Sequence, residues 1–397
     1  MKTNLMLKTG KSALIASALL VSGVGTALAD GAGTTYAFGG YAKFDAMFTD
    51  YSDATPASSD LIRQFYLPSA LPVGDGSASG DLSADFQARE TRLFFKADTV
   101  TEGGDKIGAY VEMDFFTHAD GNELVSNSYS PRLRHAFLKY NGWLFGQTWS
   151  TFQDVAALPE NLDFVGPAEG TTFVRQSQVR YTTGAWEFAA ENPETFYSIE
   201  GGAIRQSSGT DTMPDLVARY TFKLSNGGYI KVAGLYRQLN VVNTAVDASE
   251  SAFAASASGK FMFGKNDLRW MATYGTGVGR YLALAAGVDA VATAGATTTG
   301  TYTSLKAVDE MGAFVSYRHL WSDQWRSNFT YGYLSIDNPT ESPTNVTKDA
   351  SSIHVNLIYT PAPKLDIGAE IMYAERSLEN NVDGDMTRLM ISAKYAF

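Results

Sequence analysis

Apolar and polar residues alternate one by one along much of the chain. Within 36–50, Phe44 and Phe48 point to one side, whereas Lys43 and Asp45 point to the other. A repeat of two residues is the pattern of a β-strand. Each such strand has one apolar and one polar face. That arrangement fits a soluble sandwich, or a membrane barrel whose apolar faces meet lipid.

Segments of this kind recur, and they are separated alternately by a long polar loop and a short turn. Asn141-Gly142 is a favoured tight hairpin turn, whereas 51–85 and 276–304 have the composition of long loops. The predicted strands cover 36–50, 86–98, 106–117, 132–140, 143–148, 174–181, 186–190, 216–224, 229–239, 252–263, 268–274, 306–319, 325–336, 352–360, 365–375 and 386–397. About sixteen strands with this loop asymmetry predict an all-β, transmembrane antiparallel β-barrel with a water-filled lumen. A soluble secreted β protein remains the alternative.

The loop at 150–173, between the fifth and sixth predicted strands, is unusually apolar. It contains Leu158, Phe164 and Val165, which a loop exposed to water does not need. We therefore expect this third long loop to fold inward against the barrel wall and to constrict the pore. It also carries four carboxylates that we expect to face basic residues across the lumen: Asp154, Glu160, Asp163 and Glu169.

If the apolar faces meet lipid, the polar faces line the lumen, where Arg and Lys outnumber Asp and Glu. A pore lined by Arg and Lys favours anions, and the guanidinium fork suits a carboxylate. The residues that we expect to line the pore or meet the solute are Lys43, Arg92, Arg132, Arg134, Arg180, Arg219 and Arg326.

Arg132 and Arg134 project to the same side of one predicted strand, and two interpretations stay open. They could form, together with Arg180, one half of an anion-selective eyelet that faces the acids of the loop. They could instead be neutralised by Glu112 and Asp114 on the neighbouring strand. Wide pores carry many charges that select nothing, so the sequence does not decide between the two.

The register of the strand at 132–140 is also open. Simple alternation puts His135 on the same face as Leu133 and Phe137, which is the face expected to meet lipid. A β-bulge in this strand would move these side chains.

The two ends of the chain indicate export to the outer membrane. Residues 1–29 have the basic start, apolar middle and small-residue cleavage site of a secretory signal, so the barrel domain would span 30–397. The last strand alternates and ends on Phe397, with Tyr395 two positions earlier. This ending resembles the C-terminal signal that the barrel assembly machinery reads in bacterial outer-membrane proteins. Four tryptophans beside predicted short turns suit the membrane–water boundary: Trp143, Trp186, Trp321 and Trp325.

Composition excludes several other classes. The expected signal holds three of the 31 Lys and Arg, which leaves 28 against 42 Asp and Glu, a mature charge of −14. That charge argues against a nucleic-acid partner. There is no cysteine, and the four histidines lack the spacing of metal ligands. We predict no catalytic residue, metal or cofactor, and keep an outer-membrane barrel enzyme or an adhesin as the less favoured alternative.

Four stretches resemble the DcaP-like porin family of Gram-negative bacteria. They are Gly39-Gly-Tyr-Ala-Lys-Phe-Asp45, Pro131-Arg-Leu-Arg-His-Ala136, Gly146-Gln-Thr-Trp-Ser-Thr-Phe152, and Leu158-Pro-Glu160 with Gly166-Pro-Ala-Glu-Gly-Thr-Thr-Phe173. The likeness is dense from 36 to 181, and beyond that it rests on the strand pattern and the final Phe. It implies a trimeric, sixteen-stranded porin, set in outer-membrane lipid and lipopolysaccharide, that takes up dicarboxylates and other small anions.

The sequence departs from that resemblance in one respect. Some members of the family carry a helical segment before the barrel. Here only 30–35 separate the expected cleavage site from the first strand. We therefore expect the barrel walls and loops to hold any trimer together. A general diffusion pore without selectivity remains a further alternative.

Overall fold

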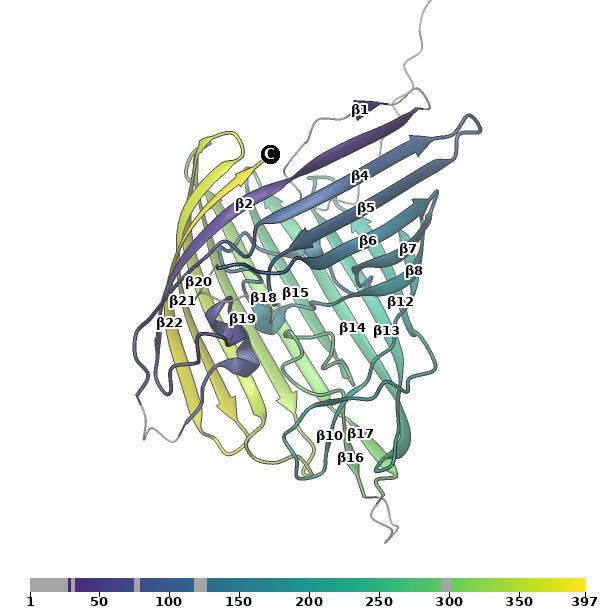
Figure 1. The fold of residues 1–397 in the computed structure, drawn as a ribbon, viewed down its shortest axis with the longest axis vertical. Helices are drawn as coiled ribbons and strands as arrows, with labels where there is room; N and C mark the ends of the chain where they lie inside the picture. The colour runs from purple at the N-terminus through teal and green to yellow at the C-terminus, as the bar shows by residue number, and fades with distance from the viewer. Residues whose placement is uncertain (1–27, 30–32, 75–78, 118–126, 295–300) are drawn as a thin grey trace, which may run out of the picture.

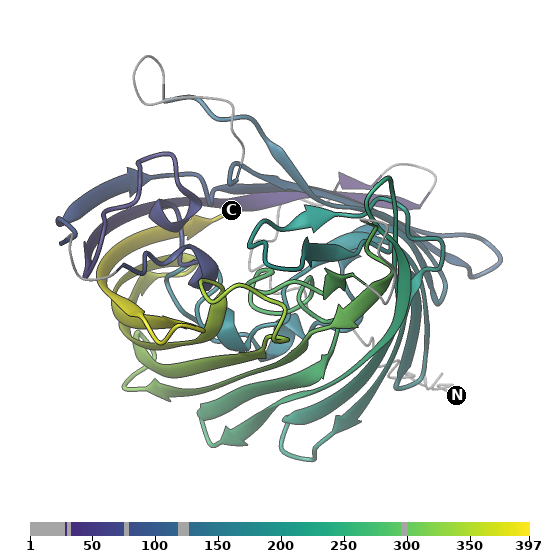
Figure 2. The ribbon, with the colours of Figure 1, turned by 90° about the horizontal axis from the view of Figure 1, so that it is seen from below.

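The computed structural model describes residues 28–29, 33–74, 79–117, 127–294 and 301–397. Sixteen long strands form a closed antiparallel barrel, and β22 pairs with β2 to close it (Figure 1, Figure 2). The wall strands are β2 (Thr34–Tyr51), β4 (Arg92–Val100), β5 (Lys106–Asp114), β6 (Arg132–Tyr140), β7 (Trp143–Trp149), β8 (Arg175–Thr183), β9 (Trp186–Glu191), β12 (Asp215–Lys223), β13 (Tyr229–Val242), β14 (Asp247–Phe263), β15 (Asn266–Thr276), β18 (Asp309–Leu320), β19 (Trp325–Asp337), β20 (Thr347–Ala362), β21 (Leu365–Leu378) and β22 (Asp383–Ala396). The predicted fold class is confirmed.

Most of the expected signal peptide, residues 1–27, lies outside the described residues, so that prediction stays a prediction. Leu28–Ala29 form the short strand β1, which pairs with Tyr36 and Thr35 of β2. Among the described residues, no helix has the length and apolar character needed to cross a membrane.

The outside of the barrel is apolar and its inside is polar, which is the reverse of a soluble core. Phe44, Ile371 and Leu389 are 46%, 54% and 43% exposed on the outer face. Lys43, next to Phe44 in β2, is 6% exposed inside the barrel. This alternation is that of a barrel whose outer face meets hydrocarbon.

The second predicted strand, 86–98, is wrong as a single element. The chain forms β3 (Ser83–Gln87) and β4, which pair with different halves of β2. Between them, Thr91 exchanges side-chain hydrogen bonds with the backbone of Lys43. Gly40 lies so close to Arg92 that a Cβ there would fall 2.0 Å from the Arg92 carbonyl oxygen. Because of this break, the long strand β2 pairs with two shorter strands, β3 and β4.

A β-bulge in β6 settles the register that the sequence left open. Glu112 pairs with His135 and Met113 with Leu133, so Arg134 lies between them without a partner in the ladder. Leu133 is 50% exposed, whereas Arg134 and His135 are both buried. The extra residue turns these two side chains and then Phe137 inward. The expectation that Phe137 faces lipid is therefore wrong.

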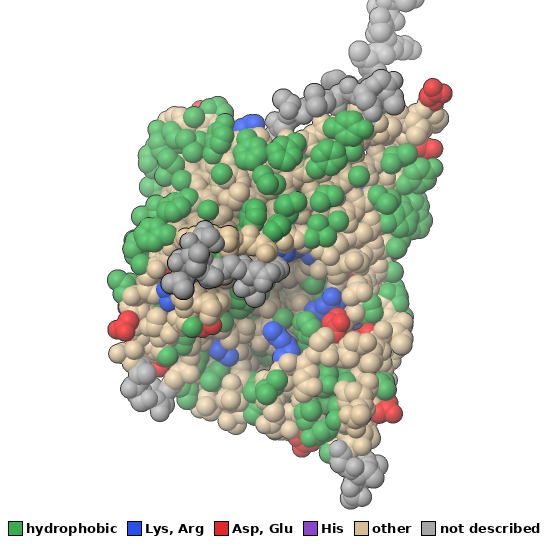
Figure 3. All heavy atoms as spheres, in the orientation of Figure 1, with side chains coloured by type: hydrophobic (Ala, Val, Ile, Leu, Met, Phe, Trp, Pro, Cys, Tyr) green, Lys and Arg blue, Asp and Glu red, His purple; other side chains and the backbone are tan. Residues whose placement is uncertain are grey.

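The wall is low on one side of the barrel. Strands β4 to β9 contain six to nine residues each, whereas β13 to β15 and β18 to β22 contain eleven to seventeen. Figure 3 shows a hollow beyond the ends of the short strands, with Lys and Arg side chains inside it. Because these strands are short, the interior of the barrel is open toward this side (Figure 3).

Long loops at the end opposite the termini fold over the lumen. Two segments expected to be plain loops form a four-stranded sheet of β10 (Phe196–Ile199), β11 (Gln206–Ser207), β16 (Ala290–Thr293) and β17 (Ser304–Ala307). The loop after β2 contains two short 3-10 helices, η1 (Leu61–Arg63) and η2 (Pro68–Ala70), and enters the barrel far enough to bury Tyr66 completely. Together these loops narrow the lumen around the third long loop.

Candidate functional site

The loop between β7 and β8 crosses the inside of the barrel, as predicted. It contains two short 3-10 helices, η3 (Val155–Ala157) and η4 (Ala168–Gly170), which contact β14 and β15, and β18 and β19, respectively. At Gly170 the contact is so close that a Cβ would fall 2.2 Å from the Ala313 backbone. The apolar residues of the loop pack on the wall, as their composition indicated, with Val165 5% exposed.

Asp154 and Glu160 attach the first half of the loop to the far wall. Asp154 accepts hydrogen bonds from Lys231 Nζ (2.6 Å) and Ser258 Oγ (2.9 Å). Glu160 accepts two from Arg326, Nε to Oε2 at 2.8 Å and Nη2 to Oε1 at 2.6 Å. Such paired, charge-assisted bonds fix both distance and orientation.

Asp163 and Glu169 attach the second half of the loop to the loop that follows β2. The Asp163 carboxylate accepts from the Tyr66 backbone N–H at 2.9 Å. Glu169 accepts from the Tyr66 hydroxyl at 2.5 Å and from Ser352 Oγ at 3.0 Å. Glu169 is completely buried, and burial raises the pKa of its carboxyl. These two acids thus hold two inward-folded loops together.

Cations from other strands donate to the backbone of the same loop. The pairs are Arg219 with the Gln153 carbonyl (2.6 Å), Arg269 with Leu158 (2.6 Å) and Lys43 with Leu162 (2.7 Å). A backbone carbonyl that is buried away from water, as at Gln153 and Leu162, needs a donor from the protein. Three of the seven cations predicted to line the pore, Lys43, Arg219 and Arg326, therefore hold the loop in place.

Of the two interpretations left open for Arg132 and Arg134, the structure shows the pairing with Glu112 and Asp114, and neither these arginines nor Arg180 forms an ion pair with the four acids of the loop among the described residues. Arg132 instead makes two hydrogen bonds of 2.8 Å with Asp114. Arg134 donates to Glu112 and Asp114, each at 2.7 Å. Arg180 lies 3.6 Å from Glu187. The loop reaches these arginines with the ring of Phe164, which lies 5.9 Å from the Arg132 guanidinium and 5.5 Å from that of Arg134, whereas its acids are paired elsewhere.

All seven basic residues predicted to line the pore lie inside the barrel, and each has a carboxylate within 4.0 Å. Lys43 meets Glu90 and Asp45, Arg92 meets Glu112, Arg132 meets Asp114, Arg134 meets Glu112 and Asp114, Arg180 and Arg219 meet Glu187, and Arg326 meets Glu160 and Asp366. Their placement inside agrees with the parity argument. Their neutralisation by neighbouring acids could not be deduced from parity.

Sequence reasoning missed Arg175. It is the first residue of β8 and pairs with Trp149, the last residue of β7. Its guanidinium lies 4.6 Å from the centre of the Trp149 ring. Parity along β8 puts Arg175 on the opposite face from Arg180, so it was not among the residues expected to line the pore. At the end of the strand its guanidinium nevertheless lies over Trp149, whose ring is near Arg134 and His135 inside the barrel.

Two small cavities lie between the loop and the wall. One, of about 60 Å³, is lined by residues that include Lys43, Glu160, Arg326 and Lys394. The other, of about 110 Å³, is lined by residues that include Trp149, Asp154, Arg180 and Lys231. Both put cationic side chains beside open space next to the constriction.

Comparison with known proteins agrees with this architecture. The family model described as DcaP outer membrane protein matches residues 34–397. The chain belongs to the DcaP outer membrane protein family. Among solved structures, the outer membrane channel DcaP of Acinetobacter baumannii is 25% identical, with a TM-score of 0.74, and the match covers 94% of this chain and all of that one. The comparison with curated proteins found no match.

More distant porins share the fold. OmpT of Vibrio cholerae is 12% identical, with a TM-score of 0.55, over 94% of this chain and 100% of that one. OmpF of Salmonella typhi is 11% identical, with the same TM-score and the same coverage. The DcaP-family chain is thus an outer-membrane porin of a Gram-negative bacterium.

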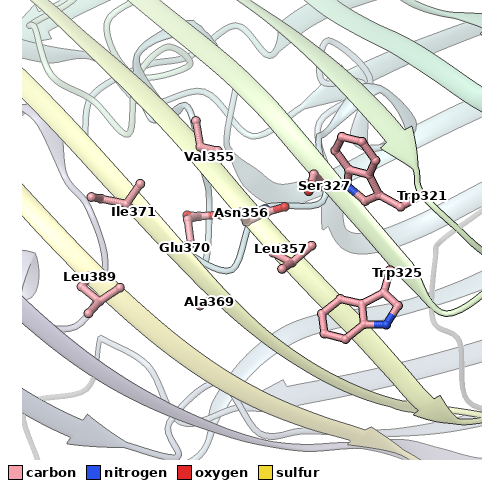
Figure 4. A pocket seen from close by; sticks show the side chains of 10 residues that line it. All are labelled: Trp321, Trp325, Ser327, Val355, Asn356, Leu357, Ala369, Glu370, Ile371 and Leu389. Atoms are coloured by element: carbon pink, nitrogen blue, oxygen red, sulfur yellow. Dashed lines mark hydrogen bonds between the residues drawn. The ribbon is translucent and has the colours of Figure 1, made fainter.

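The outer surface of this DcaP-family porin suits lipid. Trp321 and Trp325 border a broad apolar groove whose other walls include Leu357, Ile371 and Leu389 (Figure 4). Trp321 and Trp325 are 60% and 40% exposed, beside the turn that joins β18 to β19. Aromatic rings at such turns belong to the membrane–water boundary. The groove therefore faces lipid and is no solute site.

The C-terminal residues lie in the seam that closes the barrel. The backbone N–H of Phe397 donates to the Gly40 carbonyl at 3.0 Å. Tyr395 is 51% exposed on the outer face and pairs with Ala42. Both positions are compatible with the predicted role as an assembly signal.

Proposed function

We propose that this porin lets small anionic solutes, dicarboxylates among them, cross the outer membrane by passive diffusion. The supporting observation is an excess of cations at the outer ends of β4 to β8. Among the described residues there, Arg92, Arg132, Arg134 and Arg175 lie around Glu112 and Asp114, with Glu90 also near Arg92, so four guanidinium groups face three carboxylates. A cationic group of this kind at a constriction lowers the barrier for anions and raises it for cations.

Planar-bilayer recording with succinate as a competing permeant tests this proposal. A pore with cations at its constriction gives a chloride current that succinate reduces in a saturable manner. A current that falls only in proportion to bulk conductivity contradicts a preference for dicarboxylates. The experiment uses the full-length protein, folded and purified in detergent.

A general diffusion pore is the second candidate, and one observation favours it. Each of the seven cations predicted from the sequence already has a carboxylate within 4.0 Å, and several hold the loop in place. Neutralised cations select less than free ones. This candidate predicts similar permeability for neutral sugars and for dicarboxylates of the same size in liposome swelling.

We further propose that the porin works as a homotrimer, with lipid and lipopolysaccharide around its outer wall. Strands β7 and β9 contain seven and six residues, fewer than the about nine to eleven that cross the hydrocarbon core, so a neighbouring copy would cover this part of the wall. One structure of the distantly related OmpT is described as a trimer form. Chemical cross-linking in outer membranes tests this: bands at three times the monomer mass are expected, and a monomer alone contradicts it.

Assembly through the C-terminal strand is part of the same proposal. Tyr395 and Phe397 would be read by the barrel assembly machinery before the seam with β2 closes. Deletion of Phe397 should leave unassembled protein that is sensitive to protease in the periplasm. Normal insertion of that variant contradicts this role.

A further inference from the structure

Arg175 differs from every other arginine among the described residues, because its guanidinium has no hydrogen-bond acceptor and no carboxylate partner. The other lumen arginines have such partners, as Arg326 has Glu160 and Arg132 has Asp114. Nη1 of Arg175 is buried without a partner. Its guanidinium packs on the face of the Trp149 ring.

An unpaired cation in this position is costly for the fold. Arg134 and Arg132 lie close enough to Arg175 to repel its charge, and the attraction of Asp114 offsets only part of that repulsion. A cation–π contact offsets part of this cost but supplies no acceptor for the five N–H groups of the guanidinium. A buried polar group that is left unsatisfied calls for an explanation, and a functional site is one of the places where such groups are expected.

Trp149 fixes the position of Arg175. The indole of Trp149 is 9% exposed and lies between the rings of His135 and Phe173, with centroid distances of 5.5 and 4.7 Å. A side chain held in this way presents its guanidinium at the rim of the low wall without a salt bridge. Nη1 is buried, but Nε and Nη2 are not buried in the same way and Arg175 as a whole is half-buried, so these N–H groups stay available to a solute.

The surroundings of Arg175 lie on the path of a solute. Asp114, Arg132, Trp149 and Arg175 are the terminal residues of β5, β6, β7 and β8, all at the same edge of the wall. The hollow in Figure 3 begins beyond these strand ends, and cationic side chains are visible in it. A solute that enters from the loop side passes this edge where the inward-folded loop narrows the lumen, since Arg132 and Arg134 lie 5.9 and 5.5 Å from the ring of Phe164 in that loop.

We infer that Arg175 is the carboxylate-binding residue of the entrance, held in place by Trp149 and left unpaired so that one carboxylate group of the solute can complete its hydrogen bonds. The inference rests on the proposed function and assigns it to one side chain. The planar fork of arginine binds both oxygens of a carboxylate, which a lysine ammonium cannot do in the same way. A carboxylate bound here also neutralises the charge that Arg132 and Arg134 repel.

The test uses succinate block of single-channel chloride current in the wild type, Arg175→Gln, Arg175→Lys and the control Lys265→Gln. Lys265 pairs with Asp323 on an exposed turn, so its substitution removes one charge away from the lumen. For Arg175→Gln, the concentration for half block should rise at least about tenfold, since a hydrogen bond to a charged group is lost. Arg175→Lys should keep the chloride-to-potassium permeability ratio and still bind succinate more weakly. Lys265→Gln should behave as wild type.

The outcomes separate the inference from the proposed function. If succinate fails to block the wild type, the proposed function itself is contradicted. If the wild type is blocked and Arg175→Gln is blocked equally well, the inference alone is overturned. Equal block of the wild type and Arg175→Lys also overturns the claim that the fork, and not only the charge, binds the carboxylate. Folding of each variant is checked by its heat-dependent mobility in gels, and Arg175→Lys provides the reading if Arg175→Gln does not fold.

Discussion

Glu160 in the inward-folded loop and Arg326 in β19 are joined by two hydrogen bonds of 2.8 and 2.6 Å across the lumen. Residues separated by 166 positions in the chain are thereby held at a fixed distance. Arg318 lies 3.8 Å from the same carboxylate and reinforces the attachment. The width of the pore at this level depends on such contacts.

Glu160→Gln should loosen the loop without unfolding the barrel. The amide keeps the shape of the side chain but loses the charge that makes both bonds strong, each worth about 1.5–3 kcal/mol with a charged partner. We expect larger single-channel conductance and more open-channel noise. Asp323→Asn is the control, since Asp323 pairs with Lys265 on an exposed turn. If Glu160→Gln has the single-channel conductance and the open-channel noise of the wild type, this contact does not set the pore width.

Gly170→Val tests the closest approach between the loop and the wall. A Cβ at Gly170 would fall 2.2 Å from the Ala313 backbone, so the loop must move or the strand must bend. We expect the barrel to lose its folded gel mobility at a lower temperature than the wild type. Gly234→Ala in β13 is the control, because no atom lies within 4 Å of the Cβ it would add. Equal stability of both variants would contradict the tight packing of η4 on β18.

Arg134 holds two buried carboxylates, and its removal should impair assembly more than removal of Arg132. Arg134 is 2% exposed and contacts both Glu112 and Asp114, whereas the Arg132 side chain is 20% exposed. Removal of one member of a buried ion pair typically costs about 3–5 kcal/mol. Arg134→Gln should therefore reduce the yield of folded barrel in outer membranes, and Arg132→Gln should reduce it less. Equal yields for the two variants would contradict this ranking.

The attachment of Asp154 should fail in acid. Burial alone would raise the pKa of Asp154, but the Lys231 ammonium and its hydrogen bond outweigh burial and hold that pKa below its ordinary value. A carboxyl with a lowered pKa stabilises the fold above its unfolded pKa of about 3.9 and loses that contribution as the pH falls through the lowered value. Conductance noise from a loosened loop should thus appear only below about pH 4. Asp154→Asn should show that noise already at pH 7. If the noise of Asp154→Asn still begins only in acid, as in the wild type, the pH dependence belongs to another group.

The alternation of residues was enough to predict the barrel and its sixteen strands, and the apolar residues of the third loop were enough to predict its inward path. Strand β6 begins and ends at the residues predicted, Arg132 and Tyr140. Alternation carries this information because lipid imposes an apolar face on every strand. The polar face carries no comparable constraint, so a bulge at Arg134 or a break before Arg92 leaves little trace in the pattern.

The partners of the site residues could not be predicted for a related reason. Which acid meets which arginine depends on where the loop lies inside the lumen, and the loop is placed by contacts among distant residues such as Tyr66 and Asp163. Arg175 escaped prediction because parity loses its meaning where a strand ends. A signal was present nevertheless: Arg175 directly follows an apolar loop and pairs with a Trp at the other end of that loop.

The reversal potential of the wild-type channel under a gradient of potassium chloride tests the central claim most directly. An excess of guanidinium groups at the constriction predicts a potential whose sign reports chloride as the more permeant ion, with a permeability ratio that falls toward one at high salt as the charges are screened. A potential whose sign reports potassium as the more permeant ion would contradict the account.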